Sequence, residues 1–193
     1  MRVLQPMLSL ITATLMASGL WLAAQATVLA GACTITGTGG PEELHGTPGD
    51  DVICGFGGGD VIFGRRGDDV LRGGRGSDTL GGGLGNDRLR GGPGDDSLAP
   101  GGGADISRGG GGQESSEGSP GSDQWFLGPG RDVVVDGSGI DRLVGGPGGD
   151  FCLQTRDQSG GDAILGGPGI DFWDADTRDH VQGVERRRPC PAG

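Results

Sequence analysis

The sequence contains no lysine and only two histidines, His45 and His180. Its fifteen basic residues are all arginine, and 26 acidic residues bring the net charge to −11. A chain with this negative charge is repelled by the phosphate backbone of nucleic acid. We therefore do not expect it to bind nucleic acid. Two histidines without a nucleophile motif beside them also disfavour zinc sites and Ser-His-Asp catalysis.

Long apolar runs are also lacking, apart from one near the N-terminus. This run extends from Leu8 to Ala24, follows Arg2, and precedes several small-residue cleavage patterns. Residues 1–32 are therefore interpreted as a signal peptide cut between about residues 26 and 32, which leaves no transmembrane span in the mature chain. An uncleaved anchor is the alternative, although no stop-transfer charges flank the run. Lipidation of Cys33 is a further alternative.

Glycine is abundant, with 47 of 193 residues, and it recurs in phase. Counted in nines from Gly37, one pattern continues without a slip to Leu153, and two further copies, 157–165 and 166–174, follow a three-residue insertion. The fourth place is glycine and the sixth is acidic in all fifteen copies. The eighth place is apolar in thirteen copies, the exceptions being Ser107 and Ser116. The chain is therefore a repeat array.

Each nine-residue copy has the composition of a turn followed by a short strand. One apolar residue between polar or small neighbours suits a three-residue strand with one inward side chain. Glycines at places one, two and four permit the positive φ of a tight turn. A single short strand cannot bury its apolar residue alone, so the copies are expected to stack into a solenoid with place eight as its core.

The coil at residues 100–117 should be weak, because it contains both serine exceptions.

Two stretches, Gly73–Gly81 and Gly91–Ala99, resemble the calcium-binding nonapeptide G-G-x-G-x-D-x-U-x of RTX (haemolysin-type) proteins. The opening segments Cys33–Gly37 and Asp51–Gly55 also resemble small secreted actinobacterial proteins of this class. The resemblance implies an all-β fold over residues 33–174. This fold is a parallel β-roll, a right-handed β-solenoid of about fifteen repeats with two repeats per coil. Residues 175–193 would be a C-terminal cap and tail.

The resemblance also implies several Ca²⁺ ions in the turns at both edges of the roll. Each ion would be held by turn carbonyls and by the place-six carboxylates of copies n and n+2. Stacked carboxylates about 5 Å apart repel by roughly 3 kcal/mol at an effective dielectric near 20, which favours bound cations. Oxygen-only ligands favour Ca²⁺ over Mg²⁺. The expected metal ligands are Asp51, Asp60, Asp69, Asp78, Asp87, Asp96, Asp105, Asp123, Asp132, Asp141, Asp150, Asp162 and Asp171.

Four cysteines in an exported chain indicate two disulfides, for which three pairings are possible. Proximity in the stack favours Cys33–Cys54 as an N-terminal cap, which leaves Cys152 to pair with Cys190. A buried free thiol is the alternative for Cys152, because it occupies an inward-facing place.

The repeats leave little room for a catalytic domain, so no enzymatic activity is expected. The predicted function is that of a secreted calcium-binding β-roll that folds on binding Ca²⁺ and acts as an envelope or extracellular module. The alternative is adhesion, or binding of carbohydrate or ice, with calcium only structural. That alternative predicts an outward row of one residue type at place seven or nine. The nearest approach along consecutive copies is Val52, Val61 and Val70, and there is no threonine ladder.

Overall fold

A computed structural model describes residues 32–135, 137–155, 161–169, 172–175, 179–183 and 186–187. The predicted signal peptide up to residue 31, Asp171 and Cys190 lie outside these residues, as does the side chain of Cys152. Within the described part of the chain, no helix is long and apolar enough to cross a membrane.

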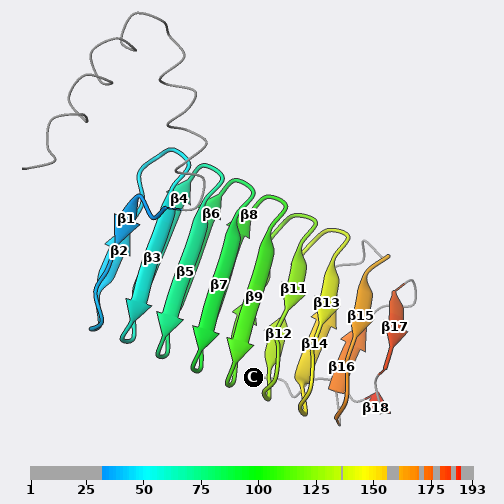
Figure 1. Cartoon of the computed structure of the whole chain (residues 1–193). Coiled ribbons are helices and arrows are strands. Elements are labelled where there is room, and N and C mark those ends of the chain that lie inside the picture. The colour runs from blue at the N-terminus through cyan, green and yellow to red at the C-terminus, as the bar shows by residue number, and fades with distance from the viewer. Residues whose placement is uncertain are drawn as a thin grey trace, which may run out of the picture. The chain divides into compact units, whose positions relative to one another are not determined.

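In the part of the chain that the structure describes, eighteen strands form two nine-stranded parallel sheets (Figure 1). The first sheet contains β1 (Ile35–Thr36), β3 (Val52–Gly57), β5 (Val70–Arg75), β7 (Arg88–Pro93), β9 (Ile106–Gly111), β11 (Gln124–Phe126), β13 (Arg142–Val144), β15 (Ala163–Leu165) and β17 (His180–Gln182). The second sheet contains β2 (Glu43–His45), β4 (Val61–Arg66), β6 (Thr79–Leu84), β8 (Ser97–Gly102), β10 (Ser115–Glu117), β12 (Val133–Val135), β14 (Phe151–Thr155), β16 (Phe172–Ala175) and β18 (Arg186–Arg187).

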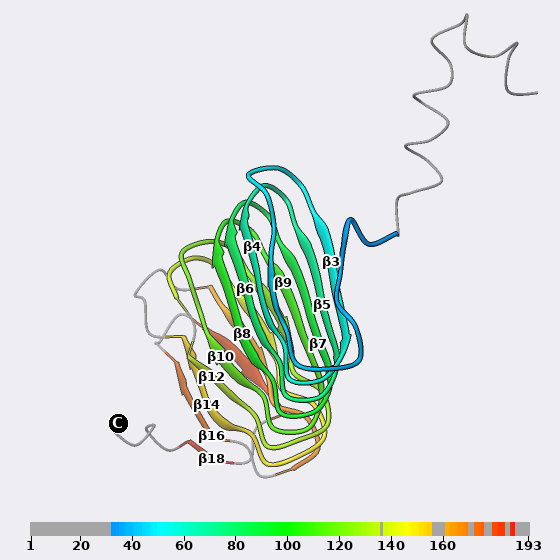
Figure 2. The same cartoon turned by 90° about the vertical axis from the view of Figure 1, so that its left-hand side faces the viewer.

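The register confirms that two repeats complete one coil. Ile53 pairs with Leu71 in the first sheet and Ile62 with Leu80 in the second, so each residue lies beside the one eighteen positions later. Consecutive repeats therefore belong to opposite sheets, and successive coils stack behind one another (Figure 2). The insertion after Leu153 lengthens one coil to 21 residues, as the pairing of Leu143 with Ile164 shows.

The strands β3 to β9 are six residues long rather than the three expected. They continue through places one to three because those residues also pair across coils, for example Arg65 with Gly83. The glycines at places two and four adopt positive φ, as at Gly74 (121°) and Gly76 (120°). Phe56 and Arg65 adopt positive φ at place two without being glycine.

The core between the two sheets is a column of place-eight side chains. Those described from Ile53 to Ile164 are fully or almost fully buried, as are Ser107 and Ser116, which replace an apolar residue in β9 and β10, whereas Leu44 is only partly buried. Trp125 lies beside Ser107 in the next coil, and Leu127 is buried at a place where most copies have glycine. These two large side chains supply apolar volume next to the coil that was expected to be weak. The buried core consists of Ile53, Ile62, Leu71, Leu80, Leu89, Leu98, Trp125, Leu127, Val134, Leu143 and Ile164.

The sheets extend beyond the fifteen recognised repeats at both ends. Ile35 in β1 pairs with Ile53, so the segment that starts at Cys33 forms half of an additional coil. Val181 in β17 pairs with Ile164, and β18 pairs with β16. Part of the segment expected to be a C-terminal cap and tail therefore continues both sheets.

Candidate calcium-binding edges

The place-six carboxylates stack in two columns along the edges of the roll. At most steps the main-chain N–H of one residue donates to Oδ1 of the carboxylate in the next coil, usually eighteen residues later, as from Asp51 to Asp69 and from Asp60 to Asp78, both at 2.8 Å. The step from Asp96 to Glu114 lacks this bond, because both carboxylate oxygens of Glu114 are without a partner. The first column contains Asp51, Asp69, Asp87, Asp105, Asp123, Asp141 and, after the insertion, Asp162. The second contains Glu42, Asp60, Asp78, Asp96, Glu114, Asp132 and Asp150.

The second oxygen of these carboxylates is buried without a hydrogen-bond partner through the middle of each column. A buried carboxylate oxygen normally has a partner, and leaving one without a partner is costly. The recurrence of the same orphaned oxygen therefore indicates a site for a cation rather than an isolated defect. The orphaned oxygens are Oδ2 of Asp60, Asp69, Asp78, Asp87, Asp96, Asp105, Asp123 and Asp132, together with both carboxylate oxygens of Glu114.

In most copies, glycine at place one leaves space beside the orphaned oxygen; the exceptions among the described residues are Pro100 and Leu127. A Cβ on Gly64 would lie 2.3 Å from Oδ2 of Asp69 and 2.6 Å from the carbonyl oxygen of Gly82 in the next coil. The same geometry occurs at Gly55, and none of these place-one glycines has positive φ. The expectation that place one needs glycine for its turn conformation was wrong. At Gly55 and Gly64 glycine is favoured because a carboxylate and a main-chain carbonyl converge on the space that a side chain would fill.

Burial raises the pKa of the column carboxylates. The pKa rises to about 6 for Asp69, Asp87 and Asp105, and in each case burial is the main cause, with charge repulsion from column neighbours a smaller contribution. The pKa of Glu114 rises to about 8, through burial and then the charge of Asp132. Loss of hydration therefore raises the pKa of these carboxylates more than their mutual repulsion does, although repulsion was the effect considered in predicting bound cations from the sequence.

The donor chemistry fits Ca²⁺. Carboxylate and main-chain carbonyl oxygens are hard ligands, which suit a hard cation with flexible coordination. Among the described residues, no three His, Cys, Asp or Glu side chains gather as a metal cluster, so an ion at these edges would also need carbonyl ligands. This donor set does not suit zinc, which prefers several nitrogen or sulfur side chains.

The N-terminal coil differs, because its carboxylates have partners within the protein. Oδ2 of Asp51 accepts hydrogen bonds from the main-chain N–H and the hydroxyl of Thr47, at 2.6 and 2.9 Å. Thr38 donates to both carboxylate oxygens of Glu42, and these bonds lower the pKa of Glu42. Threonine at place two thus takes over at this end the role that a cation would have further along.

A disulfide joins Cys33 and Cys54 across this same end, with their Cα atoms 5.9 Å apart. The predicted N-terminal pairing is therefore confirmed. A sulfur in a disulfide cannot carry a lipid, so the structure contradicts lipidation of Cys33.

Twelve of the thirteen predicted aspartates lie buried in the two columns, and the thirteenth is Asp171. Glu114 was not among the predicted ligands, although its acidic side chain at place six could have indicated that it belongs to a column. Asp179 was also missed, and its Oδ1 accepts from the N–H of Asp162 at 3.3 Å. The signal there was Asp179 followed by the apolar Val181, the spacing of places six and eight.

The fold and the two carboxylate columns define a repeat protein of the calcium-binding β-roll class. The chain matches the RTX calcium-binding nonapeptide repeat in four copies, at residues 36–71, 55–89, 81–113 and 126–153. These matches cover more than half of the chain, which therefore belongs to the RTX calcium-binding repeat family. No curated protein matches it. RTX repeats are typical of secreted proteins, and the disulfide suggests an extracytoplasmic location.

Proposed function

We propose that this chain is a secreted calcium-binding β-roll that folds when Ca²⁺ binds and acts as a structural module outside the cell or at its envelope. The aspartates of the two columns are the proposed ligands. Each ion would bind the Oδ2 atoms of stacked carboxylates together with main-chain carbonyl oxygens of the turns. The observation that carries the proposal is the orphaned Oδ2 that recurs along both edges.

The energetics of the core support coupling between metal binding and folding. Each repeat contributes one buried apolar side chain, worth about 1.5–3 kcal/mol, while nine residues lose conformational entropy. A buried carboxylate without a partner adds to that cost in the metal-free state. A ligand that binds only the folded form shifts the equilibrium towards it, so Ca²⁺ would supply the missing stability.

The residue assignment is tested by removing charge inside and outside a column. Asp69→Asn with Asp87→Asn keeps an acceptor at Oδ1 but removes two proposed ligand charges. The control is Asp68→Asn with Asp95→Asn, which changes two exposed place-five aspartates whose Oδ1 atoms accept main-chain N–H groups of the next coil. Isothermal titration should show at least tenfold weaker Ca²⁺ binding for the column variant than for the control. Equal losses would mean that overall charge, not the columns, determines binding.

A further inference from the structure

The outward face of the first sheet is positively charged, although the chain as a whole is strongly acidic. The residues at places seven and nine of this sheet point outward, because place eight points into the core. From β1 to β17, within the described residues, these places contain no acidic residue. The second sheet has Glu43 and Glu117 at the equivalent places. The first sheet instead carries Arg72, Arg88, Arg90, Arg108 and Arg142 there.

Three of these arginines form a row that crosses the strands. Arg72 pairs with Arg90 and Arg90 with Arg108, so their Cα atoms are spaced by about 4.8 Å, the distance between strands. The row continues to Phe126, whose ring lies 5.2 Å from the guanidinium carbon of Arg108. Arg90 and Arg108 are exposed, and in the part of the chain described here no salt bridge reaches either of them or Arg88.

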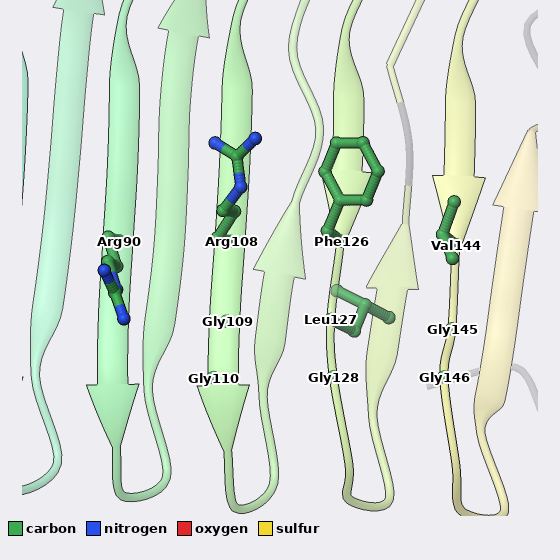
Figure 3. A pocket seen from close by; sticks show the side chains of 10 residues that line it. All are labelled: Arg90, Arg108, Gly109, Gly110, Phe126, Leu127, Gly128, Val144, Gly145 and Gly146. Carbon is green, nitrogen blue, oxygen red and sulfur yellow. The ribbon is translucent and has the colours of Figure 1, made fainter.

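A shallow groove runs beside this row, because the neighbouring places are mostly glycine (Figure 3). The groove has a volume of about 420 Å³. The side chains of Arg90, Arg108, Phe126 and Val144 line it together with a stretch of glycines, which we call the glycine floor: Gly109, Gly110, Gly128, Gly145 and Gly146. A second groove of about 410 Å³ on the same face is lined by Arg72, Arg75, Arg90 and Phe56. Arg90 lines both grooves, so the two grooves are neighbours along the arginine row.

We propose that this groove binds a linear acidic polysaccharide with a carboxylate or sulfate on its sugars. Guanidinium groups bind such anions through paired, charge-assisted hydrogen bonds. The aromatic ring of Phe126 and the flat glycine floor provide a surface for sugar rings, which have no donor or acceptor on their apolar faces. Anions bound along the row also relieve repulsion between Arg90 and Arg108, which no salt bridge reaches within the described residues.

The spacing favours an extended saccharide over nucleic acid. An extended chain of pyranose rings advances by about one strand spacing per sugar, so one anion can meet each arginine of the row. The phosphates of duplex DNA wind round the helix, each strand advancing by about 3.4 Å of helix axis per phosphate, so they do not form a straight row that matches the arginines. The carboxylate columns at both edges would repel any polyanion, so the proposal requires that Ca²⁺ neutralise them.

The test uses the full chain saturated with Ca²⁺ and a chondroitin sulfate octasaccharide, which has one carboxylate or one sulfate on each sugar. Arg90→Gln with Arg108→Gln should weaken binding in isothermal titration by roughly tenfold for each arginine. The control is Arg65→Gln with Arg66→Gln, which removes the same charge from exposed residues of the second sheet and should change affinity less than twofold.

Three results would overturn the proposal. The first is an equal loss in both variants, which would show non-specific charge attraction. The second is tighter binding of single-stranded DNA with the same number of charges. The third is no binding by the native chain at low salt. Far-UV circular dichroism of the same samples separates this proposal from the calcium proposal, because a β-rich chain that does not bind the octasaccharide contradicts only the former.

Discussion

The main-chain N–H of Asp69 donates a 2.8 Å hydrogen bond to Oδ1 of Asp87, and Oδ2 of Asp87 is left buried without a partner. The bond links two successive coils, so the side chain of Asp87 has a structural role and a free ligand oxygen at once. The same arrangement repeats along both edges. Each column is therefore built by the fold and presents buried carboxylate oxygens that a bound cation would satisfy.

Removing the charge of a column carboxylate should have opposite effects on the metal-free and calcium-bound states. In chelator, Asp87→Asn should favour the folded form, because a neutral amide costs less to bury than a carboxylate without a partner. Less trimethylamine N-oxide should then be needed to induce β structure, as measured by circular dichroism. In Ca²⁺ the same variant should be less stable than the native chain. A purely structural aspartate would lose stability in both conditions.

Acidification should likewise affect the two states in opposite directions. The pKa of Asp69, Asp87, Asp96, Asp105 and Asp123 in the folded metal-free chain is about 6, above the ordinary value of 3.8. The folded state therefore binds more protons than the unfolded state between these values. Its stability is greatest below about pH 4 and is lost as the pH rises through about 6.

In chelator, β structure measured by circular dichroism should thus increase as the pH falls from 7 to 4. With Ca²⁺ present, protons compete with the ion, so Ca²⁺ affinity should fall as the pH drops through about 6. Metal-free β content that falls on acidification would contradict the burial of charged carboxylates.

Gly55→Ala should disrupt a proposed calcium site, whereas Gly57→Ala in the same strand should not. A Cβ on Gly55 would lie 2.2 Å from Oδ2 of Asp60 and 2.6 Å from the carbonyl oxygen of Gly73. A Cβ on Gly57 would have its nearest neighbour at 3.6 Å. Overpacking of this kind typically costs about 1–3 kcal/mol. The Ca²⁺ concentration at the folding midpoint should rise only for Gly55→Ala, and similar midpoints for the two variants would rule out the crowded site.

Ser107→Ala with Ser116→Ala should stabilise the coil at residues 100–117. Both hydroxyl groups are buried without a partner, a state that costs about 1–3 kcal/mol for each group. At intermediate Ca²⁺, limited proteolysis between Gly109 and Gly121 should slow in this variant. Ser97→Ala, at an exposed position in β8, is the control and should change stability by less than about 0.5 kcal/mol. Faster cleavage of the double variant would show that these hydroxyls have partners.

The period of nine was enough to predict the two facing sheets, the eighteen-residue coil and the core column, because each depends only on the phase of places four, six and eight. Contacts between coils were harder to predict, because they join residues eighteen positions apart. The requirement for glycine at place one is such a contact. So is the arginine row, which appears only when every second copy is compared. Val52 and Val70 lie on the first sheet and Val61 on the second, so the apparent valine row is divided between two faces.

Leu127 was missed for a different reason. It occupies a place that the repeat assigns to glycine, yet it is fully buried and belongs to the core next to the coil that contains Ser107 and Ser116. The period describes an average repeat, whereas packing depends on the particular copies that meet. The additional strands at the two ends were missed because their segments lack the glycines that define the pattern.

Ca²⁺ binding at the two carboxylate columns is proposed to fold the chain. The most direct measurement is a Ca²⁺ titration of the mature chain at neutral pH, followed by far-UV circular dichroism. Mg²⁺ at the same concentrations is the control, because its stricter octahedral coordination and tightly held water suit these edges poorly. We expect a change from mostly coil to β-rich with Ca²⁺ and much less change with Mg²⁺. Spectra that remain unchanged from micromolar to millimolar Ca²⁺ would contradict the proposal.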